Sequence, residues 1–383
     1  MHPLTANPPP PPFAPTGSRW AVVGGGLLGI ELARQLAAAG HAVTLIEAAP
    51  HLGGLADTWQ LGDIAWDRHY HVTLLSDTRL RQMLESLGLI DELHWKETRT
   101  GFYTDGRLFS MSNSLEFLKF PPLGLVGKFR LALTILRASR IRDWKKLEGI
   151  PVVDWLRRWS GRATTEKIWL PLLRAKLGEN YRHASAAFIW AIIARMYAAR
   201  RTGLKKELFG YVRGGYGRIL ERAADALLDA GVTLREASRV SHIVSNDYGL
   251  DIEYDDGSME SFDHVAVTVA APIAARMCPQ LSDDERTKLN ALRYQGIICA
   301  SLLLRKPLAG YYVTNITDPA PFTAIIEMTA LVDPDEFGGK HLVYLPKYVA
   351  PDDPLFEMPD QRIRDEFLAG LMKIHPHIEP DDV

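Results

Sequence analysis

The feature that most constrains the fold is a glycine-rich turn between an apolar run and a helix-like pattern. Residues 20–23 are apolar and lead into Gly24-Gly25-Gly26, after which leucines recur at helical spacing over residues 28–36. Residues 42–46 form a second apolar run, which ends at Glu47. The order of strand, glycine turn, helix and strand predicts a compact Rossmann-type βαβ unit at this end of an α/β protein.

Gly24, Gly26 and Gly29 have the G-x-G-x-x-G spacing of a dinucleotide-binding turn. In that turn the first glycine permits a tight bend, the second lets the backbone approach a pyrophosphate, and the third allows close packing of helix on strand. The helix N-terminus offers N–H groups to phosphates, and an acid about twenty residues later accepts hydrogen bonds from ribose hydroxyls. The expected contacts with the nucleotide come from Gly24, Gly26, Leu27, Leu28, Gly29, Glu47 and Ala48.

A second glycine pair, Gly53-Gly54, follows Glu47 closely. Here the chain resembles the flavin-containing amine oxidase superfamily, which includes protoporphyrinogen oxidases, phytoene desaturases and UDP-galactopyranose mutases. In those proteins a Gly-Gly pair after the ribose-binding Glu runs alongside the diphosphate and the ring of the flavin. The resemblance implies FAD as the cofactor, with contacts from Gly53, Gly54 and Leu55. The basic residue that usually precedes the pair is His51 or is absent.

The resemblance extends to two later segments. Residues 67–71, Asp-Arg-His-Tyr-His, are similar to the segment that approaches the isoalloxazine face, and His71 matches the family's histidine. His71 is therefore a candidate catalytic residue, although a histidine beside aromatic residues is equally typical of a structural role. Gly214-Gly215 and the helix-like pattern after it resemble the family's second nucleotide segment, in which the backbone at Val240 would meet the adenine.

The order of patterns along the chain is α/β, mostly helical, α/β again and then β-rich. It predicts a discontinuous FAD-binding domain of residues 18–75 and 207–275. A helical and β-rich substrate domain, residues 76–206 and 276–383, is inserted into it. Residues 1–17 are expected to form a disordered, proline-rich tail.

Candidate substrate-binding residues lie in the middle helices and in a late strand. Arg174 and Lys176 are candidates for binding a carboxylate or phosphate of a small-molecule substrate, although a solvated helix face is the favoured explanation. The same basic cluster contains Arg182, Arg195, Arg200, Arg201, Lys205 and Lys206. Lys347 matches, in residue type and region, the lysine that holds a water near the reactive flavin nitrogen in amine oxidases, and is a second candidate catalytic residue.

The end of the sequence departs from the family pattern. The related families carry a further strand and helix whose glycine and acidic residues complete the flavin site. This sequence ends at Asp381-Asp382-Val383, after a helix-like stretch over residues 363–374, without such a motif. The expectation is a partial chain, with consequences for flavin affinity and stability.

Composition limits the classes of partner and compartment. The 383 residues carry a net charge of −2, so no global field favours nucleic acid or an anionic membrane. Cys278 and Cys299 have neither metal-ligand nor redox spacing, so no metal is expected, and two cysteines are too few for a disulfide scaffold. Residues 1–20 lack the features of a secretory signal, and residues 184–199 are too short to span a bilayer, so a cytoplasmic enzyme is expected. Peripheral membrane contact stays open through residues 115–142, for which core packing is favoured.

Together these observations predict an FAD-dependent oxidoreductase that transfers a hydride from an organic substrate to FAD. Two alternatives stay open at this point. One is a non-redox flavin mutase acting on a nucleotide sugar, which His71 and the middle-region arginines would suit. The other is a non-catalytic remnant of the flavin fold.

Overall fold

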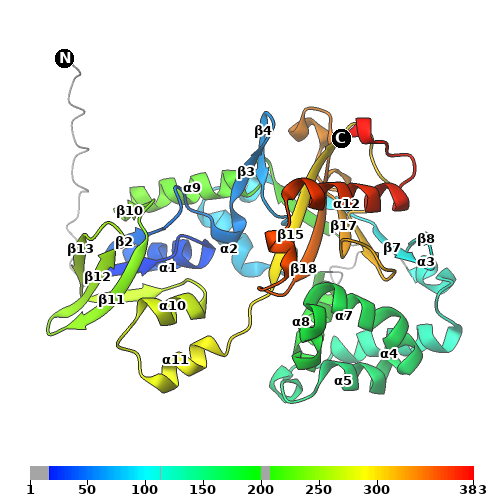
Figure 1. The fold of residues 1–383 in the computed structure, drawn as a ribbon, viewed down its shortest axis with the longest axis horizontal. Coiled ribbons are helices and arrows are strands. Elements are labelled where there is room, and N and C mark those ends of the chain that lie inside the picture. Colours follow the sequence, from blue (N-terminus) through cyan, green and yellow to red (C-terminus); the bar gives the residue numbers. More distant parts are fainter. Residues whose placement is uncertain (1–16, 113, 200–207) are drawn as a thin grey trace. The chain divides into compact units, whose positions relative to one another are not determined.

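The computed structural model describes residues 17–112, 114–199 and 208–383 (Figure 1). They form two compact units, each made of two segments. Residues up to Thr58 and Tyr216–Arg293 make the first unit, and Trp59–Gly215 and Tyr294–Val383 make the second. The expected proline-rich tail up to residue 16 and the basic residues Arg200, Arg201, Lys205 and Lys206 lie outside the described residues.

The expected domain limits at residues 75, 207 and 275 differ from the limits of these units. Residues 73–74 pair with residues 209–210 in a small sheet of the second unit, so both strands group with that unit. Residues 271–277 pack against the strand 240–246 and group with the first unit. Both differences arise because backbone pairing and packing join segments that the sequence pattern alone separates.

The first unit is built on a four-stranded parallel sheet in the order β10-β2-β1-β14. Its strands are β1 (Arg19–Val23), β2 (Ala42–Ile46), β10 (Thr233–Arg235) and β14 (His264–Val267). Helix α1 (Leu27–Ala38) connects β1 to β2, which confirms the predicted α/β fold and βαβ unit. The parallel order places the carboxyl ends of β1 and β2 side by side, so the glycine turn and Glu47 lie at one edge of the sheet.

Antiparallel strands and three helices complete the first unit. An Asp256-Gly257 turn joins two of these strands, and Gly257 has the positive φ of +79° that such a turn requires. Core residues that include Ala21, Ile46 and Ile252 fill the space between this sheet and the parallel sheet. The elements are β11 (Val240–Asn246), β12 (Gly249–Tyr254), β13 (Met259–Phe262), α9 (Gly215–Asp229), α10 (Ala271–Met277) and α11 (Asp283–Asn290).

The second unit contains a six-stranded sheet in the order β15-β18-β17-β16-β7-β8. All of its neighbouring pairs are antiparallel except β16 with β7. Helix α12 (Asp360–Ile374), drawn in red in Figure 1, packs on one face against Leu302, Val343 and Leu345. The strands are β7 (Thr100–Thr104), β8 (Arg107–Ser110), β15 (Gly296–Leu304), β16 (Val313–Ile316), β17 (Ala324–Glu327) and β18 (His341–Val349).

The expectation of a mostly helical segment from residue 76 is wrong for residues 93–110. After α2 (Thr78–Ser86) the chain forms β6, β7 and β8, and β7 and β8 are joined through Asp105-Gly106. Both turn residues have positive φ, +53° and +70°, which is the geometry of a tight hairpin turn. The remaining strands of the unit are β3 (Thr58–Leu61), β4 (Ile64–Asp67), β5 (Thr73–Leu74), β6 (Leu93–Glu97) and β9 (Leu208–Val212).

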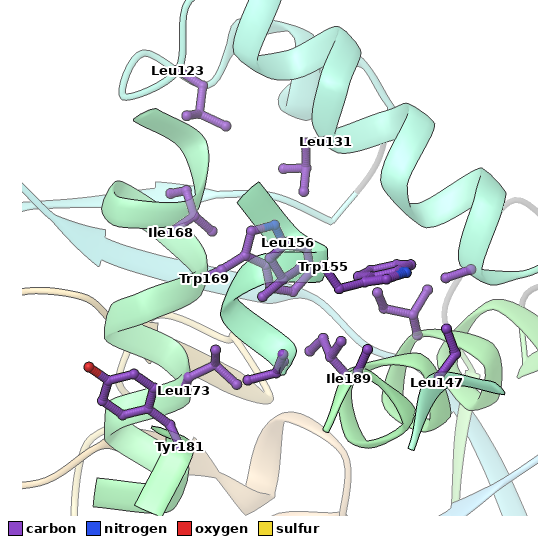
Figure 2. Close-up of a cluster of buried hydrophobic side chains, with 14 of the residues drawn as sticks. Leu123, Leu131, Leu147, Trp155, Leu156, Ile168, Trp169, Leu173, Tyr181 and Ile189 are labelled. Carbon is purple, nitrogen blue, oxygen red and sulfur yellow. The ribbon is translucent and has the colours of Figure 1, made fainter. Parts of the chain in front are cut away.

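A helical bundle with its own core forms the rest of the second unit (Figure 1). Figure 2 shows Leu131, Trp155, Leu156 and Trp169 directed into this core. A π-helical turn over Thr165–Trp169 joins α6 to α7. The helices are α3 (Ser114–Lys119), α4 (Leu125–Ala138), α5 (Val152–Ser160), α6 (Arg162–Thr164), α7 (Leu170–Leu177) and α8 (Ala186–Ala199).

The expected core packing of residues 115–142 is only half correct. One side of α4 enters the bundle core through Leu131 and Ala138. The opposite side leaves Leu125 and Phe129 exposed, at 79% and 70%. Within the described part of the chain, none of the helices combines the length and the apolar character needed to cross a bilayer.

Candidate functional site

Gly24 makes the bend that ends β1. Its φ is +113°, a region that side-chain-bearing residues rarely adopt, and its N–H donates to the Ile46 carbonyl at 2.8 Å. Thr268, at the end of β14, donates its hydroxyl to the Val23 and Gly24 carbonyls, each at 3.0 Å. Thr268 thus holds the turn from the neighbouring strand, a contact that the sequence did not predict.

Gly26 differs from Gly24 because the protein gives no conformational reason for a glycine there. Its φ and ψ are −73° and 174°, which any residue adopts, and it is the N-cap of α1 without a side-chain capping bond. A Cβ atom on Gly26 would meet no atom within 4 Å. The first turn of a helix has N–H groups without intrahelical partners, and these attract anions. Open space above such a turn fits the approach of a nucleotide pyrophosphate to the backbone.

Gly29 is required by packing within the turn itself. A Cβ atom at this position would lie 1.8 Å from the Gly24 carbonyl oxygen, well inside van der Waals contact. The helix therefore approaches the bend as closely as the third glycine of a dinucleotide fingerprint allows. Leu27 and Leu28 form the first turn of α1, and Leu28 is 69% exposed.

Glu47 links the end of β2 to the glycine turn. Its carboxylate accepts hydrogen bonds from the Gly25 N–H at 2.6 Å and from the Ala49 N–H at 2.8 Å. Ala48, between Glu47 and Ala49 in the chain, is exposed. The acid thus lies beside the turn, where it also has oxygen lone pairs for ribose hydroxyls.

We expect Glu47→Gln to lower the free energy of unfolding by about 2 kcal/mol, because the amide nitrogen cannot accept one of the two backbone hydrogen bonds. FAD affinity should fall with it. Urea unfolding and FAD titration would measure the two effects. Glu221→Gln is a matched control on the exposed surface of α9, with an expected change within about 0.5 kcal/mol. Equal unfolding curves for the Glu47 variant and the wild type would contradict this role.

The second glycine pair packs directly against the first turn. Gly53 donates its N–H to the Gly25 carbonyl at 2.9 Å, and a Cβ on Gly54 would lie 3.2 Å from the Gly26 Cα. Both glycines have positive φ, +143° and +59°. The pair therefore extends the open surface at the α1 N-terminus, next to Leu55, which is 80% exposed. His51 pairs with Asp57 at 3.0 Å and lies beside this segment.

The second nucleotide segment is joined to the same edge. The Ser238 N–H donates to the Glu47 carbonyl at 2.9 Å, and the Ala237 N–H donates to the Ala49 carbonyl at 2.8 Å. The Glu236 carboxylate accepts a hydrogen bond from the Leu52 N–H at 3.0 Å, and no sequence motif predicted this contact. Val240 follows, with its side chain buried beside Ile46. The structure therefore gathers every candidate cofactor residue in the first unit.

The second unit contains His71, half-buried beside the buried residues Asp67 and Tyr344. Its Nδ1 lies 3.9 Å from an Asp67 carboxylate oxygen, and the Asp67 carbonyl accepts a hydrogen bond from the Tyr344 hydroxyl at 2.6 Å. Burial lowers the pKa of His71, and a hydrogen bond with the His69 backbone partly offsets that effect. His71 is therefore neutral at pH 7 and can accept a proton.

Lys347 lies on the other face of the sheet from this group. Side chains alternate along β18, so Tyr344 and Tyr348 point to the same face of the sheet. On that face the Tyr348 hydroxyl lies 2.6 Å from the Tyr70 hydroxyl. Lys347 instead shares its face with Val343 and Leu345, which pack towards α12. The two candidate catalytic residues are thus not brought together.

Arg174 and Lys176 are also separated in their contacts, although both are on α7. Arg174 lies over the Tyr181 ring at 5.4 Å and near Glu179, with 3.6 Å between charged atoms. Lys176 instead lies over the Tyr348 ring at 5.2 Å. Arg195, in the same predicted cluster, pairs with Asp77 at 2.7 Å. These residues make local contacts in different directions.

The parallel sheet, glycine turn and acid define a dinucleotide-binding α/β protein with a discontinuous nucleotide unit. The model of the family "Flavin containing amine oxidoreductase" matches residues 29–383, and the chain belongs to this family. Family members typically bind FAD.

The curated relatives with similar sequences include 15-cis-phytoene desaturases. The 15-cis-phytoene desaturase of Capsicum annuum is 28% identical in an alignment of 161 positions that covers 36% of this chain and 26% of the desaturase. The Arabidopsis thaliana desaturase is 34% identical over 126 residues, 32% of this chain and 21% of that protein. The matches thus cover about a quarter of the length of these relatives.

Solved structures share the fold at lower identity. A protoporphyrinogen oxidase-like protein from Exiguobacterium sp. matches with a TM-score of 0.73 and 20% identity, over 94% of this chain and 84% of that one. Putrescine oxidase bound to putrescine matches with a TM-score of 0.71 and 18% identity, over 95% and 82%. The P. acnes fatty acid isomerase has a TM-score of 0.69 and 14% identity, over 93% and 82%. At these identities the likeness shows the fold alone.

Proposed function

We propose that this chain binds FAD at the glycine turn of its first unit and works as an FAD-dependent oxidoreductase. The observation that carries the proposal is Gly26, whose φ suits any residue and whose missing Cβ leaves open space at a helix N-terminus. Since nothing in the fold requires glycine there, a ligand close to the backbone accounts for it. Phosphates suit this position because the helix dipole and the N–H groups favour negative charge.

Different residues around the turn would bind different parts of FAD. The α1 N-terminus and the Gly53-Gly54 backbone would hold the diphosphate, and Glu47 would accept hydrogen bonds from the ribose. The backbone at Val240 would meet the adenine. FAD, when bound, supplies the acceptor for a hydride from the organic substrate.

In the second unit, His71 is the residue that we assign to proton transfer. Removal of a hydride from an amine or from a C–H bond leaves a proton on the oxidised substrate, and a neutral imidazole can accept it. The ring nitrogen that does not bond to the His69 backbone is the atom that would take the proton. Lys176 and Arg174 remain candidates for an anionic substrate group, and Lys347 has no assigned step because it lies on the opposite face of β18.

The pH dependence of flavin reduction tests the role of His71. Its pKa is lowered by burial, so the ring stays neutral as the pH falls to the ordinary histidine value of about 6.5. We expect the rate of anaerobic flavin reduction by substrate to be constant from pH 8 to about 6.5 and to fall below that. His71→Ala should reduce the rate by about 10²-fold or more and remove this acid limb. An unchanged acid limb in that variant would exclude His71 as the base.

Anaerobic addition of candidate substrates also separates redox from non-redox chemistry. Anaerobic bleaching of the flavin at visible wavelengths by an amine or an unsaturated lipid would support an oxidoreductase. Thermal stabilisation by a nucleotide sugar, without bleaching by any of these compounds, would instead favour a mutase.

A further inference from the structure

The outer side of α4 carries an exposed row of large apolar side chains. Leu125, Val126 and Phe129 are 79%, 73% and 70% exposed, and Leu133 one turn later is 40% exposed. Leu118, on the preceding helix α3, is 57% exposed. We refer to these five residues as the apolar stripe. Single exposed apolar residues are ordinary, but a row along one helix marks a surface that binds something.

Packing of the bundle does not explain the stripe. The opposite side of α4 already fills the bundle core with Leu131 and Ala138, as Figure 2 shows for Leu131. A polar contact fixes the same side, because the Thr134 hydroxyl lies 2.8 Å from that of Ser160. The helix is therefore held in place with its apolar stripe facing away from the core.

The charge of the helical segment that carries the stripe favours an anionic partner. Residues 114–199 hold sixteen Lys and Arg but six Asp and Glu, a net charge of +10 in a chain whose total is −2. The remaining sequence is correspondingly acidic, with 28 basic and 40 acidic residues. Exposed basic residues lie at both ends of the stripe, and they are Lys119, Arg137, Arg140, Arg142, Lys145 and Lys146.

Aromatic residues accompany the basic residues at the C-terminal end of α4. Trp144 is 39% exposed and stacks on Trp190 with 6.3 Å between ring centroids. Arg137 lies over the Trp159 ring at 3.9 Å. Tryptophan beside cationic side chains is typical of surfaces at the boundary between lipid headgroups and acyl chains.

We infer that the apolar stripe docks on the surface of an anionic phospholipid bilayer, with α4 in the interfacial plane. Aliphatic and aromatic residues would enter the acyl boundary while the basic residues meet the headgroups. A second copy of this chain fits less well, because a symmetric contact through the stripe would bring two segments of charge +10 together. This inference does not depend on the proposed FAD chemistry.

Vesicle sedimentation of the full chain tests this docking surface. We expect binding to phosphatidylcholine vesicles that contain phosphatidylglycerol, with much less binding to pure phosphatidylcholine. Raising the salt from about 0.1 M to about 0.5 M should weaken the binding, because the headgroup attraction is screened. The double variant Leu125→Gln/Phe129→Gln should lower the partition coefficient by about ten-fold or more. Lys145→Glu/Lys146→Glu should lower it for the charged vesicles alone.

The control is Met259→Gln, which removes a side chain of similar exposure, 66%, from β13 of the first unit and should leave binding unchanged. Circular dichroism would verify that each variant is folded, as expected for exposed positions. The inference is overturned if the wild type does not sediment with charged vesicles, or if the double variant sediments as well as the wild type. It is also overturned if ultracentrifugation without lipid shows a dimer that the double variant dissociates.

Discussion

Gly26→Val abolishes FAD binding and leaves the protein folded: this is the result we expect from the geometry of the glycine turn. The φ of −73° accommodates valine, and a Cβ at this position meets no protein atom within 4 Å. The cost to the fold should stay near about 1 kcal/mol, the loss typical of placing an apolar residue at an N-cap, and Gly124→Val should show a similar cost. The new side chain would occupy the space through which a pyrophosphate reaches the α1 N-terminus. We expect affinity for FAD to fall by about 10²-fold or more, since the phosphate contacts are charge-assisted.

Gly124→Val provides a closely matched control. Gly124 is also the N-cap of a helix, with φ and ψ of −68° and 167°, and a Cβ there likewise meets no atom within 4 Å. It should leave FAD binding unchanged. Isothermal titration with FAD and thermal unfolding of both variants separate ligand loss from misfolding. If Gly26→Val binds FAD as the wild type does, the pyrophosphate does not lie at this turn.

Gly29→Ala should have the largest effect on the stability of the first unit. The added Cβ would lie 1.8 Å from the Gly24 carbonyl oxygen, and this contact is with backbone that a rotamer change cannot relieve. The helix has to move away from the turn, and the added Cβ would also crowd the Thr268 hydroxyl, 3.0 Å away. We expect the free energy of unfolding of the first unit to fall by about 3 kcal/mol, the upper end of the range for an overpacked site. An alanine inside a helix would otherwise stabilise by about 0.5–1 kcal/mol.

Gly127→Ala is the control for this effect. Gly127 is the third residue of α4, as Gly29 is of α1, but the nearest atom to its Cβ is the Thr164 hydroxyl at 3.1 Å. A small shift of that side chain relieves the contact. Hydrogen exchange of peptides covering residues 19–46 along a urea series would report the first unit separately from the second. Equal protection in Gly29→Ala and the wild type would show that the turn tolerates a side chain.

The nucleotide turn was predictable from sequence because its determinants are local. Apolar runs before Gly24 and before Glu47, with leucines at helical spacing between them, encode β1, α1 and β2. The Gly53-Gly54 contact with this turn came from family resemblance rather than from periodicity. Glu236 and Thr268 were missed, because each reaches the site through a bond to a residue more than 180 positions away.

The second unit was only partly predictable. The β7–β8 hairpin is encoded locally, because Asp105-Gly106 is the same kind of Asp-Gly turn as residues 256–257. The pairing of β7 with β16 joins residues 100–103 to 313–316, and no local pattern encodes such a distant register.

Lys347 shows the limit of matching by residue type. Alternation along β18 was visible in the sequence, but the face that meets Tyr70 and Asp67 is set by the Tyr70–Tyr348 and Asp67–Tyr344 contacts. Only the folded chain shows that Lys347 points the other way. The stripe on α4 is similar, because apolar residues on both sides of a helix do not reveal which side is buried.

The visible absorption spectrum of the purified full chain, with release and identification of any bound nucleotide, tests the central claim most directly. Supplying FAD during purification makes the result independent of cofactor lost in handling. We predict the two-band spectrum of a protein-bound flavin, and FAD as the released nucleotide. A colourless protein that shows no saturable binding in an FAD titration would contradict the account.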